Sequence, residues 1–223
     1  MLPIGLLLTS EELTVKKAWG MPGTTNFAGG VSDSVYGATA YDLNYDSVTA
    51  KKAWFFFDNE VVCLGAGINS NSPENITTTI NQCWLKGNVK SVSFSGILKS
   101  NSIDSLKNPK WIWHDSIGYF FPSGGNIAVS NQTQSGEWYR INKSQPQEIV
   151  KGDVFKLWIN HGTKPIDNSY EYIVVPAINN EKQMQTIYPL KNIKIEKNTA
   201  EVQAVSNTKL DMLQIVFYKG GNV

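Results

Sequence analysis

Residues 48–68 read VTAKKAWFFFDNEVVCLGAGI, and this stretch predicts the fold class. Successive side chains of a β-strand point to opposite faces, so Val48 and Trp54 share one face while Phe55 and Phe57 share the other. The C-terminal half of the segment is therefore apolar on both faces. That pattern is typical of a central strand covered by a layer of structure on each side.

The dipeptide Asp58-Asn59 follows this strand, and Asn and Asp tolerate the positive φ of tight hairpin turns. We expect residues 48–57 and 61–68 to pair antiparallel. Similar runs rich in Val, Ile, Thr and aromatic residues recur along the chain between Gly, Asn, Ser and Pro clusters. The expected strands are Tyr36–Leu43, Val48–Phe57, Val61–Ile68, Ile76–Leu85, Val89–Phe94, Trp111–His114, Gly118–Phe121, Asn126–Ser130, Val154–Asn160, Tyr170–Val175, Ile193–Ile195, Val202–Val205 and Met212–Tyr218.

So many short strands predict an all-β protein, a large antiparallel β-sandwich, because they cannot lie in one flat sheet without splitting into packed layers. One helical turn is expected over Asn180–Ile187, which begins with an Asn cap and ends before Pro189. We treat residues 1–223 as a single domain. The apolar start, Met1–Leu8, is interpreted as structure or an arbitrary beginning, since no positive residue precedes it and no signal peptide is recognisable.

Charge and composition exclude several classes of partner. The chain carries 20 basic and 19 acidic residues, a formal charge of +1, so no overall field attracts nucleic acid or an anionic membrane. No run approaches the roughly 18 apolar residues of a membrane helix. Arg140 is the one arginine of the chain, which limits bidentate recognition of carboxylate or sulfate.

Residues that could carry chemistry are few. His114 and His161 both end aromatic strands, and we interpret them as structural. Cys63 and Cys83 lie in apolar segments and are expected to be buried free thiols without metal-ligand spacing. We therefore expect no catalytic residue, no metal site and no cofactor, although a structural calcium ion stays open.

Most of the seven tryptophans lie in strand interiors and are assigned to the core. Trp19 is the exception, because it stands in the Gly- and Pro-rich segment 18–26, where a loop tryptophan can stack on a ligand. Packing is the competing interpretation. Trp19, Asn26 and Arg140 are the candidate carbohydrate-binding residues.

The chain resembles polysaccharide lyase family 8, and within it the chondroitin AC, hyaluronate and xanthan lyases. The likeness covers about residues 15–218 and is carried by the segments Asn26–Asp33, Tyr36–Ala38, Ala50–Asp58, Cys63–Ile68, Pro73–Thr79, His114–Tyr119, Gly152–Gly162 and Tyr172–Pro176.

The resemblance implies the central β super-sandwich domain of that family, which packs against a catalytic α-toroid and walls a polysaccharide cleft. It also implies that the catalytic Asn, His, Tyr and Arg belong to the helical domain, which we expect to be absent here, as is the smaller C-terminal β-domain. The sandwich would then be incomplete at its N-terminal side. Pro22-Gly23-Thr24-Thr25 is similar to a family signature, but two alignments of this region remain open, and Trp19 matches a substrate-stacking aromatic in only one of them.

The resemblance leads to one functional expectation and two alternatives. We expect the β-domain of a glycosaminoglycan lyase, structural and carbohydrate-contacting and inactive alone, from a secreted or periplasmic parent that performs β-elimination on chondroitin or hyaluronan. The alternatives are an independent carbohydrate-binding module and a subunit of a split lyase. Partners would be the polysaccharide and a helical lyase domain, with self-association through unpaired strand edges.

Overall fold

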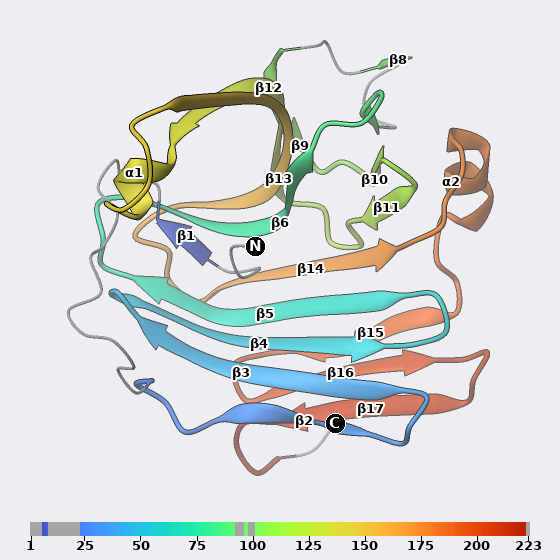
Figure 1. Ribbon diagram of the computed structural model, residues 1–223. Helices are drawn as coiled ribbons and strands as arrows, with labels where there is room; N and C mark the ends of the chain where they lie inside the picture. Colours follow the sequence, from blue (N-terminus) through green and yellow to red (C-terminus); the bar gives the residue numbers. More distant parts are fainter. Residues whose placement is uncertain (1–5, 9–22, 92–95, 98–100, 222–223) are drawn as a thin grey trace.

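The computed structural model describes residues 6–8, 23–91, 96–97 and 101–221, which form three antiparallel sheets (Figure 1). The fold is all-β, as the sequence predicts. The nine-stranded sheet contains, in spatial order, β2 (Ala28–Ser32), β3 (Gly37–Tyr45), β4 (Val48–Phe56), β5 (Val61–Ser70), β14 (Asn168–Val175), β11 (Ile117–Phe120), β10 (Trp111–His114), β7 (Lys90–Ser91) and β8 (Gly96–Ile97).

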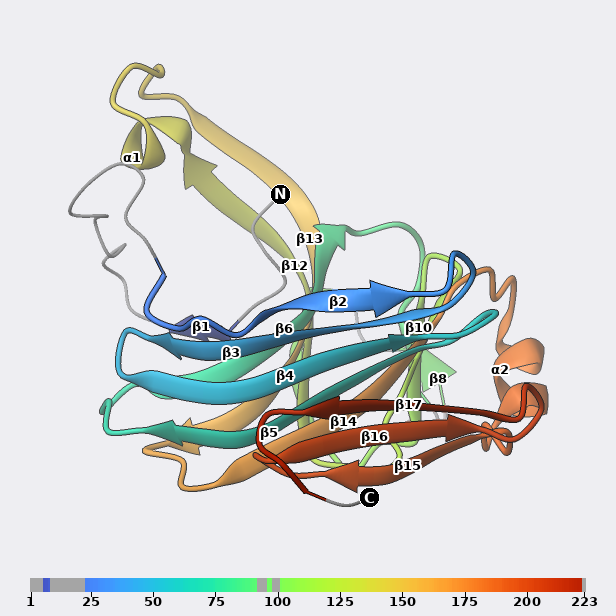
Figure 2. The same ribbon diagram turned by 90° about the horizontal axis from the view of Figure 1, so that it is seen from below.

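Two smaller sheets cover the two faces of this one (Figure 2). The five-stranded sheet contains β1 (Leu6–Leu8), β6 (Asn75–Trp84), β13 (Ile149–Thr163), β12 (Asn126–Glu137) and β9 (Ile103–Lys107). The three-stranded sheet contains β15 (Ile193–Asn198), β16 (Val202–Asn207) and β17 (Met212–Phe217), and the helices are α1 (Trp138–Ile141) and α2 (Glu181–Ile187).

The two faces of β4 enter two separate hydrophobic cores. Val48 and Ala50 pack between the nine- and five-stranded sheets, with Trp54 partly buried against them. Ala53 and Phe55 pack on the opposite side, toward the three-stranded sheet and α2. The predicted hairpin is confirmed, since Phe56 pairs with Val61 and the strands run antiparallel. The prediction of a central strand between two layers is confirmed as well.

Each expected strand overlaps a strand of the structure, and the expected helical turn is α2. The side chain of Asn180 caps α2 by accepting the Gln183 backbone N–H at 3.1 Å. The expected strand Val89–Phe94 is described only at Lys90–Ser91, and residues 92–95 lie outside the described residues.

Five elements were missed by the sequence analysis, namely β1, β2, β8, β9 and α1. In addition, β12 and β13 extend well beyond the expected Asn126–Ser130 and Val154–Asn160, because their pairing continues to Glu137 and Ile149. Residues 131–137 are polar, so hydrophobic alternation gives no strand signal there. Backbone hydrogen bonds hold this hairpin, and it projects from the body of the molecule with α1 at its tip (Figure 2).

The core between the nine- and five-stranded sheets also holds polar side chains. The His161 ring is within hydrogen-bond distance of the Thr78 hydroxyl, with Nε2 and Oγ1 2.8 Å apart, and burial lowers the pKa of His161 to about 4. Lys52 of β4 is buried with its ammonium 5.6 Å from the Trp54 ring centroid, and burial lowers its pKa to about 8. Desolvation of such groups costs folding free energy, most of all when they are charged.

We predict that Phe55→Ala lowers the free energy of unfolding by about 3–5 kcal/mol, because Phe55 is fully buried and its removal leaves a cavity. The adjacent Phe56 is 39% exposed, so Phe56→Ala serves as the matched control and should cost about 1 kcal/mol. Urea unfolding of both variants measures the difference. Equal losses would contradict the assignment of the two faces.

We predict that the protein loses stability as the pH falls below the ordinary pKa of histidine. His161 has a folded-state pKa near 4, against 6.5 when unfolded, so the unfolded chain binds the extra proton first. Between about pH 7.5 and about pH 5 this one group should remove about 2 kcal/mol. His161→Gln should flatten the pH dependence of urea unfolding, and an unchanged slope would show that a different group is responsible for the loss.

Candidate functional site

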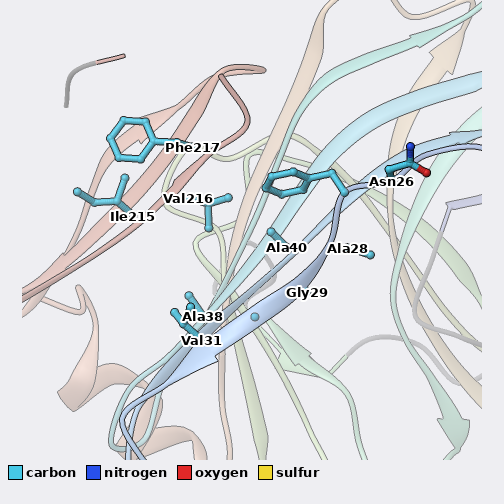
Figure 3. A pocket seen from close by; sticks show the side chains of 11 residues that line it. Asn26, Ala28, Gly29, Val31, Ala38, Ala40, Ile215, Val216 and Phe217 are labelled. Atoms are coloured by element: carbon cyan, nitrogen blue, oxygen red, sulfur yellow. The ribbon is translucent and has the colours of Figure 1, made fainter. Parts of the chain in front are cut away.

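Asn26 lies at one end of an open groove between the edges of two sheets (Figure 3). One wall is residues 26–31, which lead into and form β2, together with Ala38 and Ala40 of β3. The other wall is residues 215–217 of β17. The groove has a volume of about 350 Å³ and is lined mainly by apolar groups.

The groove exists because β2 pairs only with β3 in the described sheet and all five of its residues are exposed. Gly30 is required there, since a Cβ atom would lie 2.8 Å from the carbonyl oxygen of Ala38. The segment before β2 is held by the Thr25 hydroxyl, which donates to the Asp42 carbonyl at 2.5 Å. At the same end the Phe27 and Tyr218 rings contact each other, with centroids 4.9 Å apart.

A second groove of about 410 Å³ lies between residues 31–38 and residues 212–215 and carries more polar groups. Asp33 accepts the backbone N–H groups of Val35 and Tyr36 at 2.9 and 2.7 Å, and these bonds lower the pKa of its carboxyl. The Tyr36 hydroxyl donates to Asp58 at 2.8 Å, which raises the pKa of the tyrosine. Asp33 is therefore committed to its own turn and Tyr36 to the turn after β4, and Tyr36 stays protonated at neutral pH.

The histidines are buried in the core and do not line these grooves. His114 is stacked on Phe155 at 4.1 Å, and its Nε2 accepts the backbone N–H of Lys86 at 3.1 Å. Burial lowers its pKa, as it does for His161. Both rings are neutral at pH 7 and sit inside the sandwich, in agreement with the structural role that the sequence analysis assigned to them.

Tyrosines between the sheets are equally unsuited to accept a proton. Burial raises the pKa of Tyr119 to about 12, and it raises the pKa values of Tyr170, Tyr172 and Tyr218 further above the ordinary value. These phenols stay protonated and act as hydrogen-bonding groups. For example, the Tyr218 hydroxyl donates to the Lys52 carbonyl at 2.8 Å and so ties the segment after β17 to β4.

The two cysteines are free thiols, as predicted. Cys63 is buried, and burial raises its pKa to about 12, whereas Cys83 is only partly buried. Within the described residues, no cluster of three His, Cys, Asp or Glu side chains could hold a metal ion. No helix in the described part of the chain is long and apolar enough to cross a membrane.

The other two candidate residues are not brought together with Asn26. Trp19 lies outside the described residues. Arg140 is exposed in the last turn of α1, at the tip of the β12–β13 hairpin, and does not line the groove that holds Asn26.

A third groove, which the sequence analysis missed, lies beside Arg140. It is formed by the ends of β6, β12 and β13 together with α1, has a volume of about 310 Å³, and is lined by Gln82, Trp84, Gln134, Ser135, Gly136, Glu137, Trp138, Ile141, Val150, Lys151, Gly152 and Val154. Trp84 is 62% exposed and Trp138 is 60% exposed. Trp84 lies in the expected strand Ile76–Leu85, so the sequence analysis assigned it to the core, and the structure corrects that assignment. Trp138 lies in no expected strand, and its exposure depends on the hairpin that the sequence analysis did not extend this far.

Comparison with known proteins identifies the family. Residues 7–187 match the model of the polysaccharide lyase family 8 super-sandwich domain, and residues 194–223 match that of the family's C-terminal β-sandwich domain. The second match contains β15, β16 and β17, apart from the first residue of β15. The expectation that residues 1–223 form one domain stays a prediction beside this match.

Individual relatives agree with this result. The chain is 52% identical over 218 residues to chondroitinase AC from Pedobacter heparinus, covering 97% of this chain and 30% of that protein. It is 29% identical over 207 residues to a hyaluronate lyase from Thermasporomyces composti, covering 90% of this chain and 27% of the relative.

A solved structure of chondroitinase AC lyase, studied in complexes with oligosaccharides, superposes with a TM-score of 0.93 and 50% identity, covering 98% of this chain and 32% of that one. The chain thus spans less than a third of the length of these relatives. On the strength of the match over residues 7–187, this chain belongs to polysaccharide lyase family 8.

Proposed function

We propose that the chain is the β-sandwich part of a glycosaminoglycan lyase, which contacts the polysaccharide and supports its cleft but does not break the chain alone. The observation that carries the proposal is the state of the acid and base groups. Both histidines are buried with lowered pKa values, and each tyrosine with a shifted pKa has it raised.

β-Elimination at a uronic acid needs a base for the proton α to the carboxylate and groups that neutralise that carboxylate. A tyrosine base needs a lowered pKa, whereas burial and the Asp58 carboxylate act in the opposite direction here. The histidines have the right protonation state for a base, but a polysaccharide cannot reach them inside the core. Arg140 stands on α1, at the tip of the projecting hairpin and outside that core.

The substrate class follows from the relatives. The matched proteins are named chondroitinase AC, hyaluronate lyase and xanthan lyase, and the polysaccharides in these names all contain uronic acids. The 52% identity favours chondroitin or hyaluronan for the parent enzyme of this chain. Such polymers are extracellular, which supports a secreted or periplasmic parent. A helical domain would then supply the proton-transfer groups, as the family resemblance implies.

We predict that the purified chain produces no unsaturated uronides from chondroitin or hyaluronan. The measurement is the ultraviolet absorbance of the product double bond during long incubation, with the full-length Pedobacter heparinus chondroitinase AC as the positive control. Sustained turnover by the chain would show that it contains a working base, and the proposal would fall. A His114→Gln, His161→Gln double variant would then identify or exclude the two histidines as its source.

A further inference from the structure

The groove at the tip of the β12–β13 hairpin contains exposed tryptophan side chains that the proposed function does not explain. Two of the largest apolar side chains of the protein, Trp84 and Trp138, line the same groove and are more than half exposed. Such exposure is normally unfavourable, because burying apolar surface stabilises a protein. Ile141 of α1 is also exposed there. Contiguous exposed apolar surface rimmed by polar groups marks a binding site more often than chance exposure does.

Trp84 is held in place by a glycine on the neighbouring strand. The six-membered ring of Trp84 lies against Gly152 of β13, where a Cβ atom would be 2.1 Å from the ring carbon Cζ3. Val154 pairs with Trp84 across the same two strands, so backbone pairing fixes the main chain from which the indole projects. One part of the indole thus packs on the strand, while Trp84 as a whole is 62% exposed to solvent.

Trp138 comes from a different element. It begins α1, and Ile141, three residues later, lies on the same side of that helical turn and lines the groove with it. The tip of the hairpin therefore brings a second indole to the groove that Trp84 occupies. The site is built from strand and helix together rather than from one flexible loop.

The polar lining fits hydroxyl groups. Gln82 and Gln134 line the groove, and each amide offers both donors and an acceptor. Gln134 is oriented by Lys156, whose ammonium donates to its Oε1 at 2.9 Å. The two charged lining residues, Lys151 and Glu137, have opposite signs, so the lining has no net charge.

We propose that this groove is a carbohydrate subsite in which Trp84 and Trp138 stack on pyranose rings of the uronic-acid polysaccharide. The inference rests on the proposed function for the class of polymer. Pyranose rings present C–H groups on their faces, which the electron-rich faces of indoles attract, and they present hydroxyls at their edges for the amides. A volume of about 310 Å³ is at the small end of ligand sites, which suits one or two sugar rings.

Stacking rather than charge should dominate recognition at this subsite. Lys151 and Glu137 offset each other and the Lys156 ammonium is hydrogen-bonded to Gln134, which leaves Arg140 of α1 as a candidate partner for a uronate carboxylate. The subsite should accept chondroitin and hyaluronan oligosaccharides with similar affinity and with little dependence on salt. Attraction by scattered surface lysines would instead weaken steeply as salt is added.

The test is isothermal titration of the 223-residue chain with chondroitin and hyaluronan hexasaccharides. Trp84→Ala and Trp138→Ala should each weaken binding about tenfold, the change that corresponds to about 1.4 kcal/mol. Gly152→Ala keeps the indole but displaces it, and it should weaken binding to a smaller extent. Tyr45→Ala is the matched control, because Tyr45 is an equally exposed aromatic outside all three grooves, and this variant should bind like the wild type.

Thermal unfolding of each variant shows whether it is folded. The inference is overturned if the wild type fails to bind at millimolar oligosaccharide, if both tryptophan variants bind like the wild type, or if affinity falls steeply with salt. It is also overturned if the same two substitutions abolish self-association in sedimentation, since a protein surface would then occupy the groove. Failure of the wild type to bind would also count against the polysaccharide contact in the proposed function, whereas normal binding by both tryptophan variants would overturn this inference alone. The inability of the chain to break the polymer is tested separately, by turnover.

Discussion

Burial of the central strands on both faces is the constraint on which the rest of the structure depends. Alternate side chains of β4 enter two different cores. A shift of one residue in the strand register would therefore move each of these side chains into the opposite core. The hairpin with β5 and the pairing of β5 with β14 fix this register. The covering sheets can then vary in extent without disturbing the centre. Where they stop, at β2 and at the tip of the β12–β13 hairpin, the surface opens into grooves.

The central strands were predictable because the pattern of apolar residues along them indicates which faces are buried. Segments that pair through the backbone alone carry no such signal. Residues 131–137 are polar, yet they pair along their full length with β13, since main-chain hydrogen bonding does not depend on side-chain type. The strand β2 also lacks an apolar signal, because all its residues are exposed and two of them are adjacent glycines. The strands of the third sheet were predicted from the sequence, but their match to a second family model required comparison with known proteins.

The candidate site was less predictable than the fold, because exposure depends on tertiary structure. Asn26 does line a groove, whereas Arg140 lies beside a different one and Trp19 is outside the described residues. Trp84 was assigned to the core because it ends an apolar strand, and only the arrangement of β6 beside Gly152 shows that its outer face is uncovered. A clue was present in residues 131–138, where a tryptophan follows a run of Gln, Ser, Thr and Gly, which is unusual for a core strand.

Burial also supports the proposal that this architecture serves contact rather than catalysis. A sandwich with two cores takes both histidines and three tyrosines, Tyr119, Tyr170 and Tyr172, out of water, and desolvation moves their pKa values away from neutrality. A group that must exchange protons with a polymer needs the opposite surroundings. The side chains that line the groove at the tip of the β12–β13 hairpin include two indoles, two amides and two opposite charges, which can bind sugar rings without changing protonation. On the proposed function, a lyase built on such a domain places its base and acid on other elements and uses the sandwich as a wall of fixed shape.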